Sequence, residues 1–151
     1  MRRLFLIHLF LFLFSFKASA ETIPYEKLVG VWTVSQGGIN HDLTEAQVAE
    51  LCGTVLMIVP PDLNFGKHIR VKKDGKLMMS LDVLSKEPCT YADNLLTCQM
   101  EATAAGKSLG GGPEFTRFEK VRDGVYDMTS LKPDGMTVNE VQTMYPCSMT
   151  I

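Results

Sequence analysis

Short turns built on aspartate separate alternating runs of apolar and polar residues along much of this chain. Asp74-Gly75, Asp93-Asn94, Asp123-Gly124 and Asp134-Gly135 all tolerate the positive φ angles that tight hairpin loops require. A chain of consecutive hairpins folds as an antiparallel up-and-down meander, which must curl on itself to bury its apolar face and protect its edges. The sequence therefore predicts an all-β fold of nine or ten short strands that close into a small barrel.

Strand alternation is clearest around the first of these turns. A two-residue loop would put the apolar residues of the two strands on opposite faces. A three-residue loop over 73–75 instead pairs Val71 with Leu77 and Ile69 with Met79, so we predict a type I turn with its glycine in the left-handed conformation. The predicted buried face of this hairpin consists of Ile69, Val71, Leu77, Met79, Leu81 and Val83.

The same Asp-Gly turn recurs twice in the C-terminal third. At 122–124 it pairs Phe118 with Met128 and Val121 with Val125. At 133–135 it places Met128 opposite Glu140, a register that the pattern leaves unresolved. Strands are expected at about 114–121, 125–131 and 136–144, and the glycine-rich segment 106–113 is expected to be the longest loop.

One helix and two further strands are predicted in the N-terminal half. Residues 29–35 are rich in β-branched side chains, and 54–59 form a short apolar run that two prolines end, so both are read as strands. Residues 43–52 are expected to form a short helix, because Thr44 and Gln47 have the spacing of a capping box.

Four cysteines allow three disulfide pairings, and one turn selects among them. A two-residue loop at Asp93-Asn94 places Cys89 opposite Cys98 at a non-hydrogen-bonded site, where Cα atoms lie about 4.5 Å apart. Cys52 and Cys147 then pair by elimination. The alternative, a zinc site, usually has paired ligands two to four residues apart, and the chain contains no Cys-x-x-Cys. We therefore expect two disulfides and no metal.

The first twenty residues have the pattern of a secretory signal. Arg2 and Arg3 precede the apolar run 4–16, and Ala18-Ser19-Ala20 forms a small-residue cleavage site before Glu21. The apolar run is shorter than the roughly 20 residues of a membrane helix, which argues against an anchor. The two arginines also suggest twin-arginine export as a minor alternative. We expect cleavage near Ala20, a secreted or periplasmic domain over 21–151, and no membrane anchor in the mature form.

Removing this segment changes the charge of the chain. Residues 1–20 contain three of the 15 basic residues and none of the 17 acidic ones, so the net charge shifts from −2 to about −5. A general nucleic-acid-binding protein needs a basic surface that displaces counterions from phosphates. The acidic balance therefore excludes that class of partner.

The segment Gly30-Val31-Trp32, on the predicted first strand of a small exported β protein, resembles the Gly-x-Trp of the lipocalin (calycin) superfamily. The resemblance implies an eight-stranded barrel in which Trp32 packs across one end and Gly30 lets the chain pass close by. The position of the short helix, just after the first strand, is similar to that in the fatty-acid-binding branch of this superfamily. Small bacterial inhibitors of secreted metalloproteases share the barrel, the Gly-x-Trp and a disulfide. The resemblance is one of fold, and a shared fold does not by itself imply a shared function.

Catalytic patterns are weak in this sequence. Residues 105–108 resemble the end of a phosphate-binding loop. The motif requires a glycine five residues before Gly106, and Glu101 occupies that position. The group His41, Asp42 and Glu45 is expected to be a loop entering a helix, and His68 is expected on a solvated strand face. Eight methionines follow residue 20, and they are read as core filler or pocket lining rather than as Cu(I) ligands.

The sequence is therefore read as a non-enzymatic binding barrel without a cofactor. In one version a small apolar ligand enters the barrel, with Trp32, Met79, Leu81 and Met128 facing the interior. In the other version the barrel is filled, and the segments 106–113 or 60–66 contact an exported protein, as an inhibitor of an exported hydrolase would. A packed interior with an exposed apolar patch distinguishes the second version from the first.

Overall fold

The computed structural model describes residues 21–35 and 41–148, so the predicted signal segment lies outside the described residues. No helix among the described residues has the length and apolar character needed to cross a bilayer. The elements of this part of the chain are η1 (Tyr25–Lys27), β1 (Gly30–Val34), α1 (Glu45–Cys52), β2 (Val55–Val59), β3 (Gly66–Lys73), β4 (Lys76–Ser85), β5 (Thr90–Ala92), β6 (Leu95–Ala104), β7 (Lys107–Arg122), β8 (Val125–Leu131) and β9 (Val138–Pro146).

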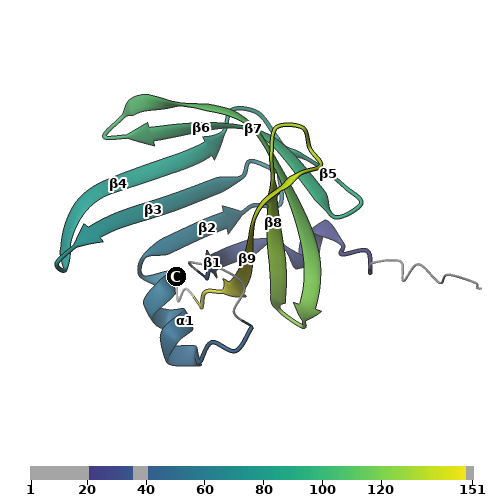
Figure 1. The fold of residues 1–151 in the computed structure, drawn as a ribbon, viewed down its shortest axis with the longest axis horizontal. Helices are drawn as coiled ribbons and strands as arrows, with labels where there is room; N and C mark the ends of the chain where they lie inside the picture. Colours follow the sequence, from purple (N-terminus) through teal and green to yellow (C-terminus); the bar gives the residue numbers. More distant parts are fainter. Residues whose placement is uncertain (1–20, 36–40, 149–151) are drawn as a thin grey trace, which may run out of the picture.

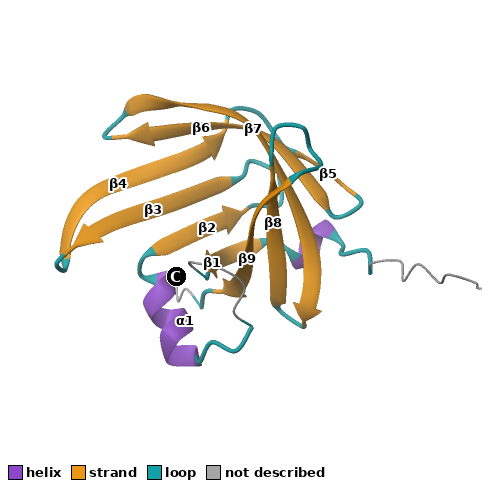
Figure 2. Ribbon diagram, viewed as in Figure 1, coloured by secondary structure: helices purple, strands orange, loops and turns teal. Residues whose placement is uncertain are grey.

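Eight of the nine strands form a closed antiparallel ring, as predicted. The sheet order is β4-β3-β2-β1-β9-β8-β7-β6-β5, and an additional pairing of β4 with β6 closes the ring and leaves β5 paired with β6 alone. β1 and β9, the first and last strands among the described residues, lie side by side. Figures 1 and 2 show the strongly curved sheet, with α1 beneath β1 and β2.

The register of the β3–β4 hairpin differs from the prediction. The turn has two residues, with φ angles of 51° at Asp74 and 73° at Gly75, rather than three. Val71 pairs with Met79 and Lys72 pairs with Leu77, because β4 contains one extra residue at this point. This bulge keeps Val71 and Met79 on one face but moves Leu77 to the other face, beside Lys72.

The two later hairpins confirm the predicted strands and correct their registers. Phe118 pairs with Met128 as predicted, but Val125 pairs with Arg122 rather than with Val121, because the register shifts by one residue after Lys120. In the last hairpin Met128 lies opposite Gln142 instead of Glu140. One residue of this change comes from a wider loop, whose Asp134 carboxylate accepts hydrogen bonds from the backbone N–H groups of Met136 and Thr137 at 2.8 Å. The other comes from a register shift between Ser130 and Leu131.

The glycine-rich segment 106–113 is strand, not loop. A two-residue turn at Ala105-Gly106 reverses the chain, and β7 begins directly after it. Gly111 is required by close backbone contact, because a Cβ atom at this position would lie 2.0 Å from the carbonyl oxygen of Met100 on β6. Gly110 adopts a φ of 98° at the bulge between these strands.

The helix α1 begins and ends close to the predicted positions. The Thr44–Gln47 capping box is present, and Gly53 is the C-terminal cap. The chain before α1 is fixed to the outside of the barrel, because His41 Nε2 lies 3.0 Å from Asp127 Oδ1 on β8. The carbonyl of His41 also accepts a 2.7 Å hydrogen bond from Arg122.

Both predicted disulfides are present. Cys89 and Cys98 face each other across β5 and β6 with a Cα separation of 4.5 Å, the value expected for that hairpin site. Cys52 at the end of α1 is bonded to Cys147 after β9, with a Cα separation of 5.8 Å. The second bond joins the end of α1 to the residue that follows β9.

Candidate binding site

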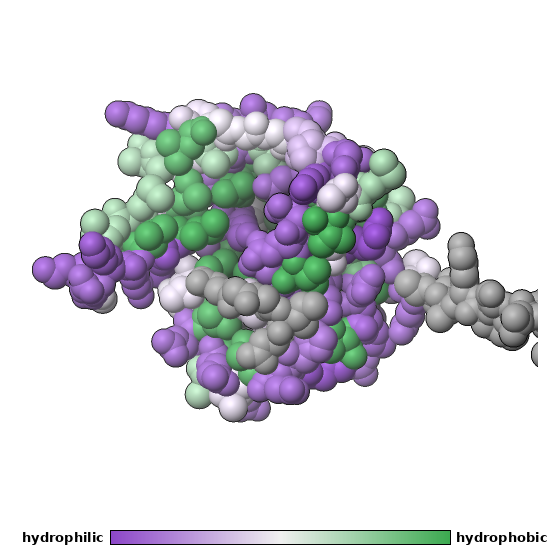
Figure 3. Space-filling view, in the orientation of Figure 1, coloured by the Kyte–Doolittle hydropathy of each residue, from purple (hydrophilic) through white to green (hydrophobic). Residues whose placement is uncertain are grey.

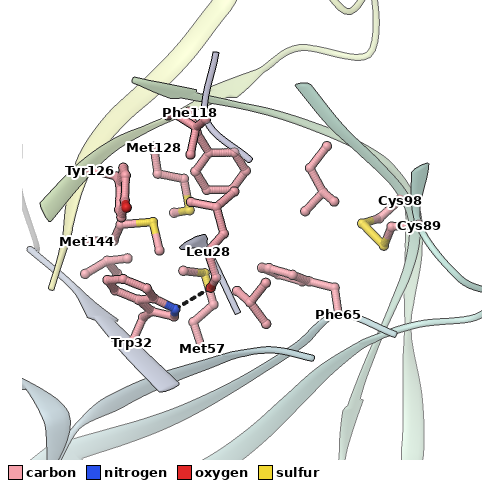
Figure 4. Packing of buried hydrophobic residues seen from close by; sticks show 14 of the residues in the cluster. Leu28, Trp32, Met57, Phe65, Cys89, Cys98, Phe118, Tyr126, Met128 and Met144 are labelled. Carbon is pink, nitrogen blue, oxygen red and sulfur yellow. Dashed lines mark hydrogen bonds between the residues drawn. A yellow bond between two sulfur atoms is a disulfide. The ribbon is translucent and has the colours of Figure 1, made fainter. Parts of the chain in front are cut away.

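The N-terminal segment 21–28, which we call the lead segment, fills one end of the barrel. Leu28 is fully buried in the centre of the cluster shown in Figure 4, and its carbonyl accepts a 2.6 Å hydrogen bond from Trp32 Nε1. Trp32 meets the ring of Tyr126 edge-on at 5.7 Å. Gly30 lies directly before this contact with a φ of 149°, a conformation that glycine favours. The Gly-x-Trp segment therefore closes this end, and the space for a ligand must lie elsewhere.

Tyrosine hydroxyls tie the lead segment to the barrel. Tyr91 donates a 2.8 Å hydrogen bond to the carbonyl of Ile23, and Tyr25 donates a 2.7 Å bond to the carbonyl of Pro60. Burial raises the pKa of Tyr91 to about 12, with a smaller contribution from Tyr126, and burial also raises the pKa of Tyr25. These hydroxyls are therefore neutral donors that secure the segment.

A cavity of about 270 Å³ remains at the other end, between β2–β3 and β7–β9. Met57, Phe65 and Met128 form its apolar part, while Lys67 and Gln142 contribute polar groups. The remaining lining residues are Glu114, Phe115, Thr116, Ser130, Leu131, Asn139 and Glu140. Its volume lies just below the roughly 300–1,000 Å³ typical of small-molecule sites, and its lining is largely polar.

The four predicted interior residues separate into two groups. Trp32 and Met128 are buried in the core, with 5% and 7% of their surface exposed, and Met128 also lines the cavity. Leu81 is only half-buried, and Met79 is 42% exposed. Met79 and Leu81 lie on the hairpin β3–β4, away from Trp32 and Met128, so the structure does not gather the four residues into one site.

This separation arises because the end of β3–β4 projects beyond its neighbours. β4 pairs with β6 only from Leu81 onward, and β3 pairs with β2 only up to Ile69. Residues 70–80, which we call the projecting hairpin, therefore continue as a two-stranded ribbon. Figure 3 shows apolar surface gathered over β3 and β4 beside a central hollow. The exposed large apolar residues of the projecting hairpin are Val71, Leu77, Met78 and Met79.

Sequence reasoning missed this surface, although one signal was present. The alternation correctly predicted one apolar face, but it could not show that the hairpin extends past the strands that would cover that face. The run Leu77-Met78-Met79 departs from strict alternation and follows several lysines. A strand with one buried face alternates apolar and polar residues, so consecutive apolar residues place at least one apolar side chain on the face away from the core.

A polar group lies on the outer face of the same hairpin, the face on which the sequence places His68. His68 Nδ1 is 2.5 Å from Asp82 Oδ1, and Ser80 Oγ is 3.2 Å from His68 Nε2. A serine hydrolase also needs a buried aspartate and oxyanion donors aimed at the substrate. Asp82 is 54% exposed here, and Arg70 Nε donates to the same His68 nitrogen at 3.4 Å. The cluster is best described as a cross-strand polar contact.

No described group of three or more His, Cys, Asp or Glu side chains has the arrangement of a metal site. In comparisons with protein families, curated proteins and solved structures, nothing matches this chain at a significant level.

Proposed function

We propose that this chain is an exported, non-enzymatic binding protein with a lipocalin-like barrel, and that it binds its partner through the projecting hairpin. The observation that carries the proposal is the exposure of Leu77 and Met78, at 58% and 64%, together with Val71 and Met79. Gathered apolar residues on a surface are typical of interaction sites. Export is supported by the two disulfides, since such bonds persist in oxidising compartments.

The barrel interior supports this proposal over that of an enclosed apolar ligand. One end is filled by Leu28 and Trp32, and the cavity of about 270 Å³ at the other end is lined largely by polar groups. A carrier for an apolar molecule needs a larger and more apolar chamber. Burial inside the barrel therefore serves stability, and the exposed apolar surface is the better candidate for binding.

The inhibitor alternative was based on two segments that give it little support. The segment 106–113 is largely strand β7, paired with β6. The segment 60–66 is packed against the barrel, because the carbonyl of Leu63 accepts a 2.8 Å hydrogen bond from the backbone of Cys89 and Phe65 is buried. A partner that needs accessible apolar side chains would find them on the projecting hairpin instead.

A second candidate function is the binding of a small amphipathic ligand in the cavity. It is favoured by the combination of Phe65 and Met128 with the polar side chains of Lys67 and Gln142, which would suit a ligand having one apolar part and one polar part. The two candidates differ in the residues they need, so one experiment separates them.

Native mass spectrometry of the protein purified from its own host tests both. We expect a bound lipid or partner chain on the wild type that is lost from the double variant Leu77→Ser/Met79→Ser. Met136→Ser is the matched control, because Met136 is 77% exposed on a different hairpin. A bound small molecule that survives Leu77→Ser/Met79→Ser but is lost in Met128→Gln would contradict the first candidate and support the second. An unliganded protein in every sample would contradict the cavity candidate and the binding of a stable partner chain by the projecting hairpin.

A further inference from the structure

We propose that the partner of the projecting hairpin is the surface of an anionic phospholipid bilayer. This inference rests on the proposed function, because it uses the same exposed residues and names what they contact. Three features carry it: the concentration of cations at one side of the molecule, the apolar side chains on both faces of the hairpin, and the predominance of lysine over arginine.

The cations gather at two neighbouring turns. The projecting hairpin and the β6–β7 turn (104–109) lie at the same side of the molecule, and pairing of Leu81 with Ala104 joins them. These two segments contain five of the 12 basic residues that follow residue 20, but only one of the 17 acidic residues, Asp74. These five basic residues are Arg70, Lys72, Lys73, Lys76 and Lys107. All five side chains are exposed, and none of them forms an ion pair within the described residues.

The rest of the chain has the opposite charge. The other residues after residue 20 contain seven basic and 16 acidic side chains. An anionic surface would therefore attract one side of the molecule and repel the others, which orients the protein with its hairpin toward the surface. Juxtamembrane lysines and arginines each contribute about 1 kcal/mol to binding of an anionic leaflet, or about a five-fold change in affinity.

The apolar residues at the end of the hairpin point to both of its faces. Val71 pairs with Met79 on the inner face, and Leu77 pairs with Lys72 on the outer face because of the bulge in β4. A protein partner laid against one face of the ribbon would leave the other apolar side chains in water. A bilayer interface surrounds an inserted tip, so it covers both faces at once.

The reach and composition of the hairpin also fit a bilayer. The five residues 76–80 extend past the β4–β6 pairing, a reach of about 17 Å at about 3.3 Å per residue, which exceeds the 5–10 Å to which interfacial elements enter a membrane. Four of the five cations are lysines. Lysine is depleted at protein–protein interfaces, where arginine is enriched, but its long stem lets the ammonium group reach lipid headgroups.

Vesicle sedimentation tests this inference. The protein is purified from the periplasm of a producing bacterium after mass spectrometry confirms removal of residues 1–20, since an unprocessed apolar segment would itself bind lipid. It is mixed with vesicles of phosphatidylcholine alone or with 30% phosphatidylglycerol, a composition chosen for the test. We expect binding to the anionic vesicles only, weakened about 25-fold in Lys73→Gln/Lys76→Gln because each lysine contributes about five-fold.

Two further variants separate charge from insertion. Leu77→Ser/Met79→Ser is expected to lose binding while keeping its thermal unfolding temperature, because the changed side chains are largely exposed. The matched control Lys132→Gln/Met136→Ser, with both residues exposed on the β8–β9 loop, is expected to bind as the wild type does. In a Leu77→Trp variant, the tryptophan emission is expected to shift to shorter wavelength when anionic vesicles are added, because Trp32 is already buried.

Two results of the sedimentation experiment would overturn the membrane proposal. The first is absence of binding to anionic vesicles at low salt, and the second is equal binding by the hairpin variants and the control pair. The wider proposed function is judged separately, by placing a photocrosslinking amino acid at Met78 and exporting the protein in its own host. A specific crosslink to one acidic protein would support a binding role for the hairpin and overturn the bilayer as its partner.

Discussion

Asn94 Oδ1 accepts a 2.7 Å hydrogen bond from the backbone N–H of Ile23, 71 residues earlier in the chain. The amide nitrogen of the same side chain donates a 2.9 Å bond to the carbonyl of Glu21. Asn94 is buried at the β5–β6 turn with a φ of 61°. One turn residue thus positions the lead segment that fills the end of the barrel.

Asn94→Gly should therefore destabilise the protein by about 1–3 kcal/mol, because it leaves the buried N–H of Ile23 without an acceptor. Glycine adopts the positive φ without strain, so the variant removes only the side-chain amide. Asp93→Gly is the control, since Asp93 lies in the same turn with a φ of 51° but is exposed. Urea unfolding measures both, and equal stability of the two variants would show that the Asn94 contacts contribute nothing.

The two disulfides should contribute unequally to stability. The chain-entropy relation gives about 4.7 kcal/mol for the 95-residue separation of Cys52–Cys147 and about 2.6 kcal/mol for the nine-residue separation of Cys89–Cys98. We expect Cys52→Ala/Cys147→Ala to be about 2 kcal/mol less stable than Cys89→Ala/Cys98→Ala in guanidinium unfolding. The reverse order would mean that packing around Cys89 and Cys98, both buried, outweighs the difference in loop length.

The buried tyrosines should ionise at a higher pH than free tyrosine, and their ionisation should unfold the barrel. Burial raises the pKa of Tyr91 from 10.0 to about 12 and raises that of Tyr126 as well. A raised folded pKa means that the stability contributed by the neutral hydroxyl is present below pH 10 and is lost as the pH rises toward 12. Absorbance at the tyrosinate band should stay low at pH 10 in the folded protein but not in urea. Half-ionisation of the tyrosines in the folded protein at pH 10 would refute this prediction.

Gly30→Ala should strain the backbone beside the single tryptophan. The φ of 149° at Gly30 is unfavourable for alanine, which costs about 1–3 kcal/mol, whereas the new Cβ would make only an ordinary contact with Trp32 Nε1 at 3.5 Å. Gly112→Ala is the control, because no atom lies within 4 Å of a Cβ at that position. Tryptophan fluorescence during thermal unfolding should show a lower midpoint for Gly30→Ala than for the control. A shared midpoint would exclude a special requirement for glycine at residue 30.

The parts of the fold that depend on local side-chain periodicity were predictable. The turn at Asp93-Asn94 determined the register that joins Cys89 to Cys98, and the capping box marked the start of α1. The errors arose at bulges, since one extra residue in a strand changes which side chains meet without altering the alternation on either side. The extra residue in β4, which moves Leu77 to the outer face, is of this kind.

Long-range context explains the remaining errors. Glycine is common in loops, but Gly111 lies in a strand. Glycine is needed there because the β6 backbone at Met100 leaves no room for a side chain. Met79 has the periodicity of a core residue, yet no neighbouring strand extends far enough to cover it. Whether an apolar face is covered depends on the relative lengths of strands distant in sequence, which no local pattern records.

The pairing of β1 with β9 has a kinetic consequence. Residues as distant as Val34 and Met144 must meet before the ring closes, whereas each hairpin can form from adjacent residues. Cys89 and Cys98 can therefore be oxidised early, while Cys52 and Cys147 come into reach only when the last strand docks beside the first. During oxidative refolding, the interval in which these two thiols remain open to alkylation would measure how long the barrel stays open.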